Sequence, residues 1–227
     1  MPDQPYEAST KRLASMTGIL YLLVILTGVI NEILVRNSLF VSGDSAATVH
    51  NILAYGFVFR AGFVISLIRF AIFILLVLNL HKMFRPVDQH WSMVMVTFAL
   101  VSISLGMVSL LFEFAAPLLI SSSGYSTLFP VEQWHAQVQF FIDMQILGDR
   151  ASQILAVWLI PLAYLIYKSG FFPKILAVLM MIAGLGYVLD SLVFILLPRL
   201  NWQIAGFAFL GELPFPLWLL IRGVKTK

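Results

Sequence analysis

The sequence contains no cysteine, and this absence excludes several classes of protein. A chain without thiols has no disulfide framework, no thiolate metal site, no iron–sulfur cluster and no cysteine nucleophile. Charge is also scarce, since 11% of the 227 residues are charged against about 25% in a typical soluble domain. With 60% hydrophobic residues and a mean hydropathy of +0.95, most of the chain must be surrounded by lipid.

Histidine and lysine are missing from the middle of every long apolar stretch. The four histidines lie at or beyond the ends of these stretches, at His50, His81, His90 and His135. A haem or zinc centre inside the membrane would lack its most common ligand, and a retinal Schiff base would lack its lysine. No basic patch with interleaved aromatic residues indicates nucleic-acid binding. We therefore expect no cofactor, no metal ion and no nucleic-acid partner.

Six apolar stretches approach or exceed the roughly 20 residues with which a helix crosses the hydrocarbon core of a membrane. They cover about residues 13–35, 57–80, 91–119, 138–167, 173–197 and 203–221. Polar residues with Gly or Pro separate them, as is usual between helices. The sequence predicts an all-α, polytopic integral membrane protein, with a single membrane domain over residues 1–227 that forms a six-transmembrane-helix bundle.

Lysine and arginine are unevenly divided between the two sides of this bundle. One side has nine of them: Lys11, Arg12, Lys82, Arg85, Lys168, Lys174, Arg222, Lys225 and Lys227. The other side has Arg36 and Arg199, with Arg60 near a span end. Because cytoplasmic loops carry the excess of basic residues, both termini are expected in the cytoplasm. In the first outer loop, Gly43-Asp44-Ser45 is expected to cap a short amphipathic helix over residues 46–55.

The fourth span contains "FFIDMQILGDRASQILAVW", in which Asp143, Asp149 and Arg150 interrupt an apolar run. A charge at the bilayer centre costs roughly 2.5–3.5 kcal/mol. At 100° per residue, these three residues fall with Gln139 and Gln153 in an arc of about 120°. The pattern predicts a helix with one polar face, which is turned away from lipid.

Polar residues in the other spans also fall on single helix faces. The third span has the stripe Ser102, Gly106, Ser109 and Glu113, at steps of four, three and four residues. Given the orientation above, most of these groups lie in the outer half of the bilayer. The sequence therefore predicts ten ligand-binding candidates: Glu32, Arg60, Arg69, Glu113, Asp143, Asp149, Arg150, Tyr187, Asp190 and Glu212.

A structural role is the alternative for each of these residues. Pairing of Arg69 with Asp149 or Glu212, or of Arg150 with Glu113 or Asp190, would hold helices together. Apolar packing would do so without the cost of desolvating charges, which argues against pure scaffolding for the whole set. The six acids among these candidates also outnumber four arginines, which are Arg36, Arg60, Arg69 and Arg150, so two carboxyl groups have no partner. They are protonated, face water, bind a cation or receive a positively charged ligand.

Nearly the whole chain resembles a bacterial family of multi-pass membrane proteins, the domain-of-unknown-function family 4386. The resemblance is carried by "RLASMTGILYLLVILTG", "SGDSAATVHNILAYGFVFRAGF", "LHKMFRP" and "YLIYKSGFFPKILAVLMMIAGLGYVLDSL". It implies a six-helix membrane fold in the plasma membrane of a prokaryote, and it implies no activity. The residues that match the family pattern are Gly43, Asp44, Asn51, Arg60, Tyr187 and Asp190.

These observations favour an outward-facing polar pocket that binds a small or lipid-like ligand for transport or sensing. One alternative is an intramembrane enzyme that uses paired carboxylates as acid and base. Another is a structural or accessory membrane subunit whose charges bind partner helices. Charges that face a common centre favour the first two, and charges on outward faces favour the third. The expected partners are membrane lipid and the ligand, and a homo-oligomer is compatible with the sequence.

Overall fold

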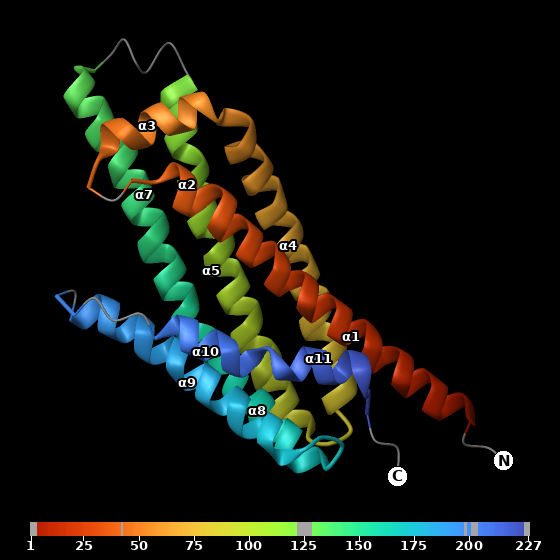
Figure 1. Cartoon of the computed structure of the whole chain (residues 1–227). Helices are drawn as coiled ribbons and strands as arrows, with labels where there is room; N and C mark the ends of the chain where they lie inside the picture. The colour runs from red at the N-terminus through yellow and green to blue at the C-terminus, as the bar shows by residue number, and fades with distance from the viewer. Residues whose placement is uncertain (1–3, 42, 122–128, 198, 201–203, 225–227) are drawn as a thin grey trace. The chain divides into compact units, whose positions relative to one another are not determined.

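The computed structural model describes residues 4–41, 43–121, 129–197, 199–200 and 204–224, and every regular element among them is helical (Figure 1). In chain order these are α1 (Gln4–Asn31), a π-helical turn η1 (Glu32–Arg36), α2 (Asn37–Leu39), α3 (Ser45–Ala54), α4 (Gly56–Phe84), α5 (Gln89–Ser121), α7 (Val131–Ile154), a 3₁₀ turn η2 (Leu155–Trp158), α8 (Leu159–Ser169), α9 (Lys174–Leu196), α10 (Ala205–Glu212) and α11 (Pro214–Ile221). The predicted all-α class is confirmed.

Five helical segments of the described residues are long and apolar enough to cross a membrane: Lys11–Leu39, Gly56–Phe84, Gln89–Leu119, Val131–Ser169 and Lys174–Leu196. They correspond to the first five predicted spans. The sixth corresponds to the shorter apolar stretch Ala205–Ile221, which is divided into α10 and α11. Its first residue, 203, lies outside the described residues, as do the basic residues 225 and 227 and part of the third predicted break, residues 122–128.

Prolines account for two interruptions of these helices. The division between α10 and α11 falls at Leu213, immediately before Pro214. Pro214 and Pro216 lack the N–H groups that a continuous helix would donate to the carbonyls of Leu210 and Glu212. The 3₁₀ turn between α7 and α8 precedes Pro161, which cannot donate to the carbonyl of Val157.

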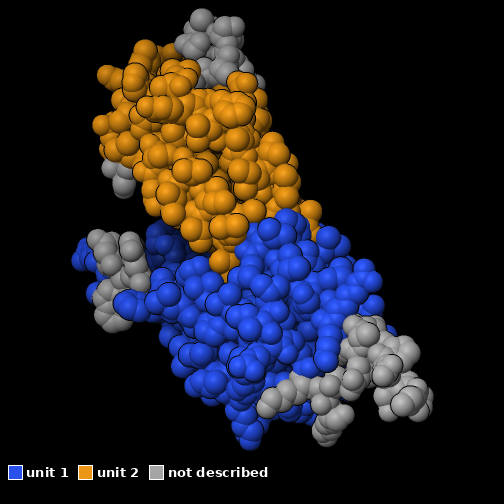
Figure 2. Space-filling view, turned by 45° about the vertical axis from the view of Figure 1, so that its right-hand side comes forward, with its two compact units in different colours: residues 1–23, 72–104, 150–227 blue, residues 24–71, 105–149 orange. Residues whose placement is uncertain are grey.

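The chain forms two compact units, which Figure 2 distinguishes by colour. Unit 1 comprises residues 1–23, 72–104 and 150–227, and unit 2 comprises residues 24–71 and 105–149. The boundaries fall within α1, α4, α5 and α7, so each of these helices contributes to both units.

In unit 2, the short helix predicted over residues 46–55 is present as α3. The side chain of Asp44 accepts a hydrogen bond of 2.9 Å from the backbone N–H of Ala47, as expected of an N-cap. The buried face of α3 carries Val49 and Ile52, which belong to one apolar core cluster with Val138 and Ile142 of α7. Burial of this face therefore fixes α3 against the longer helices of the unit (Figure 1).

In unit 1, α9 packs along α8 and α10. Two glycines allow close approach: a Cβ atom at Gly184 would lie 3.0 Å from the Cβ of Leu159, and one at Gly211 would lie 3.0 Å from the carbonyl oxygen of Leu179. Larger side chains at these positions would separate the helices. The charged groups carried by α9 and α10 are thereby held near their partners.

Candidate functional site

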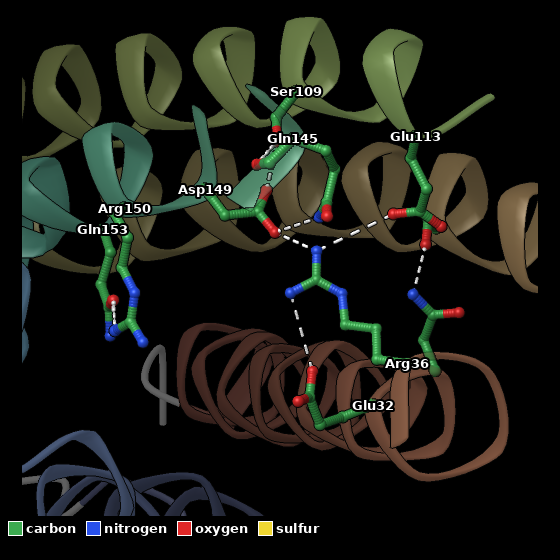
Figure 3. Close-up of polar contacts among 10 residues, drawn as sticks. Glu32, Arg36, Ser109, Glu113, Gln145, Asp149, Arg150 and Gln153 are labelled. Atoms are coloured by element: carbon green, nitrogen blue, oxygen red, sulfur yellow. Dashed lines mark hydrogen bonds and ion pairs between the residues drawn. The ribbon is translucent and has the colours of Figure 1, made fainter. Parts of the chain in front are cut away.

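Arg36 stands among three carboxylates of unit 2, as Figure 3 shows. Its Nη1 lies 3.7 Å from Glu32, its Nη2 lies 3.8 Å from Glu113, and Nη2 also donates a hydrogen bond to Asp149. Arg36 and Glu32 occupy the two ends of the π-helical turn η1. Such turns are rare and occur frequently at functional sites.

Asp149 is the most fully hydrogen-bonded carboxylate of this group. Its Oδ1 accepts from the hydroxyl of Ser109 at 2.6 Å, and its Oδ2 accepts from Gln145 at 2.7 Å and from Arg36. The neighbouring Gly148 makes this geometry possible, because a Cβ atom there would lie only 2.9 Å from the Cβ of Ser109. The backbones of α5 and α7 therefore approach closely at the point where Asp149 meets Ser109.

Glu113 of α5 is the deeply buried acid, with 2% of its side chain exposed. Its only ion pair among the described residues is the one of 3.8 Å to Arg36, and its Oε1 has no hydrogen-bond partner there. Pro117 also lies in this helix and cannot donate an N–H to the carbonyl of Glu113. Glu113 thus retains unused hydrogen-bonding capacity in both its side chain and its backbone.

Helices α1 and α4 meet beside these groups. Asn31 donates a hydrogen bond of 3.1 Å to Ser66, and a Cβ atom at Gly62 would lie 2.7 Å from the Oδ1 of Asn31. One turn further along α4, the guanidinium of Arg69 lies against Gly28, with Nη1 3.5 Å from the position of a Cβ atom there. We refer to the residues of this region as the polar centre: Asn31, Glu32, Arg36, Ser66, Arg69, Ser109, Glu113, Gln145 and Asp149.

The polar centre contains most of the unpartnered buried polar atoms. Across the described residues, six buried side-chain nitrogen or oxygen atoms lack a hydrogen-bond partner, and five of them belong to this centre. These five are Asn31 Oδ1, Arg36 Nε, Arg69 Nε, Glu113 Oε1 and Gln145 Oε1. Because buried polar groups are normally hydrogen-bonded, this concentration distinguishes the polar centre from the rest of the described residues.

Arg150 and Asp190 form a separate ion pair within unit 1. The second oxygen of Asp190 accepts hydrogen bonds from the backbone N–H groups of Ile204 (2.6 Å) and Ala205 (3.1 Å), at the start of α10. Gln153 accepts from Arg150 at 3.1 Å and from Ser191 at 3.0 Å. These contacts give Arg150 and Asp190 complete structural partners, as one of the predicted pairings expects.

Glu212, at the end of α10, is bound by two tyrosines rather than by a base. Tyr21 donates to its Oε1 at 2.5 Å, and Tyr187 donates to its Oε2 at 2.9 Å. Tyr21 is itself buried against Trp158 and Phe215. No ion pair between Glu212 and a basic residue occurs in the part of the chain that the structure describes, so the expected pairing with Arg69 is not present.

The ten predicted site residues therefore separate into three groups. Glu32, Arg69, Glu113 and Asp149 belong to the polar centre of unit 2, and Arg150, Tyr187, Asp190 and Glu212 belong to unit 1. Arg60 and Asp143 are exposed, and Asp143 accepts a hydrogen bond of 2.8 Å from Gln139. The predicted pairing of Arg69 with Asp149 is corrected, because Asp149 is paired with Arg36 and not with Arg69.

Five residues of the polar centre are missing from the ten predicted ligand-binding candidates, namely Asn31, Arg36, Ser66, Ser109 and Gln145, although Ser109 lies on the predicted stripe of the third span. The spacing of Glu32 and Arg36, four residues apart on a helix, was the available signal for Arg36. The contact of Asn31 with Ser66 joins residues 35 positions apart and has no local signal. No group of three or more His, Cys, Asp or Glu side chains among the described residues is placed to hold a metal ion.

Comparisons with known proteins show a family but no chemical activity. The family model described as Domain of unknown function (DUF4386) matches residues 16–223. An uncharacterized protein of Archaeoglobus fulgidus is 35% identical over 79 residues, which cover 35% of this chain and 48% of that protein. The chain thus spans about half the length of the curated relative it matches. No solved structure matches.

Proposed function

Since the chain belongs to the family described as Domain of unknown function (DUF4386), we propose a function from its own residues: it binds a small or lipid-like ligand in the polar centre of unit 2, for transport or sensing. We place it in the plasma membrane of a prokaryote as a multi-pass protein with both termini in the cytoplasm. In that orientation α1 runs outward, so that Arg36, at the end of the π-helical turn η1 that follows α1, belongs to the outer half of the membrane. The site would then open toward the outer face.

The observation that carries this proposal is the concentration of five unpartnered buried polar atoms in one centre. A scaffold would satisfy these atoms with each other, since an unpaired buried polar group costs about 1–3 kcal/mol. A binding site leaves them free for the ligand. Glu32, with 54% of its side chain exposed, connects the buried groups to the surface of the unit.

The two alternatives receive less support from the same contacts. An enzyme with paired carboxylates needs both members free to exchange protons. Glu113 has an unpartnered oxygen, but both oxygens of Asp149 are already hydrogen-bonded. An accessory subunit would present its charges outward to partner helices, whereas Glu113 and Asp149 face Arg36 within their own unit (Figure 3).

The test is to purify the full chain in a mild detergent and identify by mass spectrometry the lipids and small molecules that it retains. Glu113→Gln and Arg69→Gln alter the polar centre. Asp143→Asn and Arg60→Gln are matched controls, because they change exposed residues of α7 and α4. We expect a molecule that the native chain and the controls retain and that the two centre variants lose. Identical retained sets in all five proteins would contradict the proposed function.

A further inference from the structure

The unpartnered atoms of the polar centre include both hydrogen-bond donors and acceptors. Arg36 Nε and Arg69 Nε can only donate. The amide oxygens Gln145 Oε1 and Asn31 Oδ1 can only accept, and so can Glu113 Oε1 when Glu113 is ionised. A bare anion would accept from the two guanidinium groups and leave the three oxygens unpaired. A bare cation would do the reverse. A ligand that satisfies both sets must itself carry donors and acceptors.

The charged groups of the centre are incompletely compensated at two different places. Arg69 lies one helical turn from the contact between Ser66 and Asn31. It has no carboxylate within ion-pair distance among the described residues. Glu113 has one oxygen without a partner and only a distant ion pair through the other. Asp149, by contrast, is fully hydrogen-bonded. One positive and one negative group thus remain available.

A ligand with a single charge would pair with Arg69 or with Glu113 but not with both, and its charge would repel like charges of the centre. An anion at Arg69 would add negative charge to a centre in which Glu32, Glu113 and Asp149 already outnumber two arginines. A cation at Glu113 would add positive charge close to Arg36, whose Nη2 is 3.8 Å from this carboxylate, without an anion to offset it. Water could complete the hydrogen bonds, but it would leave both charges uncompensated.

We propose that the ligand is a zwitterion, with an anionic phosphate or carboxylate that binds Arg69 and a protonated amine that binds Glu113. This inference rests on the proposed function of the polar centre. The chemistry occurs in two sources: the headgroup of an aminophospholipid and a free solute such as an amino acid. In both, the opposite charges travel together, so the centre gains no net charge when the ligand binds.

The test measures binding to the full chain in detergent, by thermal stability and tryptophan fluorescence. The probes are glycerophosphoethanolamine and glycine as zwitterions, glycerophosphate as an anion and ethanolamine as a cation. Each charge-assisted hydrogen bond contributes enough that at least one zwitterion should bind about tenfold or more tightly than either singly charged probe. If glycerophosphate or ethanolamine alone binds as tightly as the better zwitterion, the inference is overturned while the proposed binding function stands.

Variants assign the two halves of the ligand. Arg69→Gln should weaken the zwitterion and glycerophosphate and leave ethanolamine unchanged, whereas Glu113→Gln should weaken the zwitterion and ethanolamine and leave glycerophosphate unchanged. Arg69→Lys keeps the charge and should retain most of the affinity, which separates loss of binding from loss of folding. Equal effects of the centre variants and the controls Arg60→Gln and Asp143→Asn would overturn the assignment.

Lipid nanodiscs distinguish the two sources. If the ligand is a headgroup, phosphatidylethanolamine should stabilise the native chain more than phosphatidylglycerol, and Glu113→Gln should abolish the difference. If the ligand is a free solute, glycine or glycerophosphoethanolamine should bind equally well in both lipids. If no probe and neither lipid binds, and purified protein retains no molecule that depends on the centre, the inference and the proposed function fail together.

Discussion

Arg150 and Asp190 form one ion pair, but their side chains differ in exposure. Asp190 has 2% of its side chain exposed and Arg150 has 29%. Arg150→Leu would leave Asp190 buried without a cation. Breaking a buried pair typically costs about 3–5 kcal/mol, and the partial exposure of Arg150 together with the two backbone donors at Asp190 should reduce the cost to about 2–3 kcal/mol.

A second change should restore part of that stability. In Arg150→Leu with Asp190→Asn, the buried charge is gone, and the amide oxygen can still accept from Ile204 and Ala205. Chemical or thermal unfolding of the purified single and double variants in detergent measures both effects. If Arg150→Leu alone leaves the unfolding midpoint unchanged, the ion pair contributes nothing and our description of its role is wrong.

The contact between α1 and α4 depends on the absence of a side chain at position 62. A Cβ atom there would lie 2.4 Å from Val35 Cγ2 and 2.7 Å from Asn31 Oδ1, which is too close for either to remain in place. Gly62→Ala should therefore destabilise the protein by about 1–3 kcal/mol, as overpacking usually does. It should also disturb the polar centre, because Asn31 belongs to it.

Gly206 provides a matched control, since nothing lies within 4 Å of a Cβ atom at that position in α10. Gly206→Ala should be neutral or stabilising by up to about 1 kcal/mol, because alanine has the higher helix propensity. The free energies of unfolding of Gly62→Ala and Gly206→Ala, measured under the same conditions, are compared with that of the native chain. Equal effects would mean that α1 and α4 do not approach as closely as the structure indicates.

The turn between α4 and α5 is fixed by Asp88, which lies outside the apolar spans. Its carboxylate accepts a hydrogen bond of 2.6 Å from Lys168 at the end of α8, and one of 3.1 Å from the backbone N–H of Trp91. The hydrogen bond from Lys168, followed by that from Trp91, lowers the pKa of Asp88 below its ordinary value of 3.8. These contacts favour the ionised form.

Because the pKa of Asp88 is lower in the folded state than in the unfolded state, the stability of the protein depends on pH. The stabilisation by Asp88 is fully present above the pKa of the unfolded chain, 3.8, and is lost as pH falls through the lower pKa of the folded chain. Asp88→Asn should therefore lower the melting temperature at neutral pH, and the difference from the native chain should shrink in acid. A difference that is independent of pH would show that the charge of Asp88 has no role.

For the whole molecule, the number of membrane crossings decides whether the two termini lie on the same side of the membrane. Five long apolar helices and the shorter stretch Ala205–Ile221 are present among the described residues. If the shorter stretch also crosses, reporter fusions at both termini should be active only in the cytoplasm, as the basic residues predict. Termini on opposite sides would mean an odd number of crossings and would contradict the six-helix topology.

Much of the fold followed from the sequence because the signals for it are local. Lipid selects apolar helices of sufficient length, so the positions of the long helices could be predicted from runs of residues alone. The N-cap of α3 at Asp44 and the interruption before Pro214 depend on residues next to one another in the chain. The buried stripe of Ser102, Gly106, Ser109 and Glu113 required only the helical period.

The partners of the charged groups were decided by tertiary structure. Periodicity places Asp149 on a polar face, but it cannot distinguish Arg36 from Arg69 as the base that meets it, because both lie on distant segments. The choice depends on the π-helical turn that rotates Arg36, and on Gly148, which brings α7 against α5. Composition determined that the charges must avoid lipid, whereas the packing of backbones determined which of them meet and which buried polar atoms have no partner among the described residues.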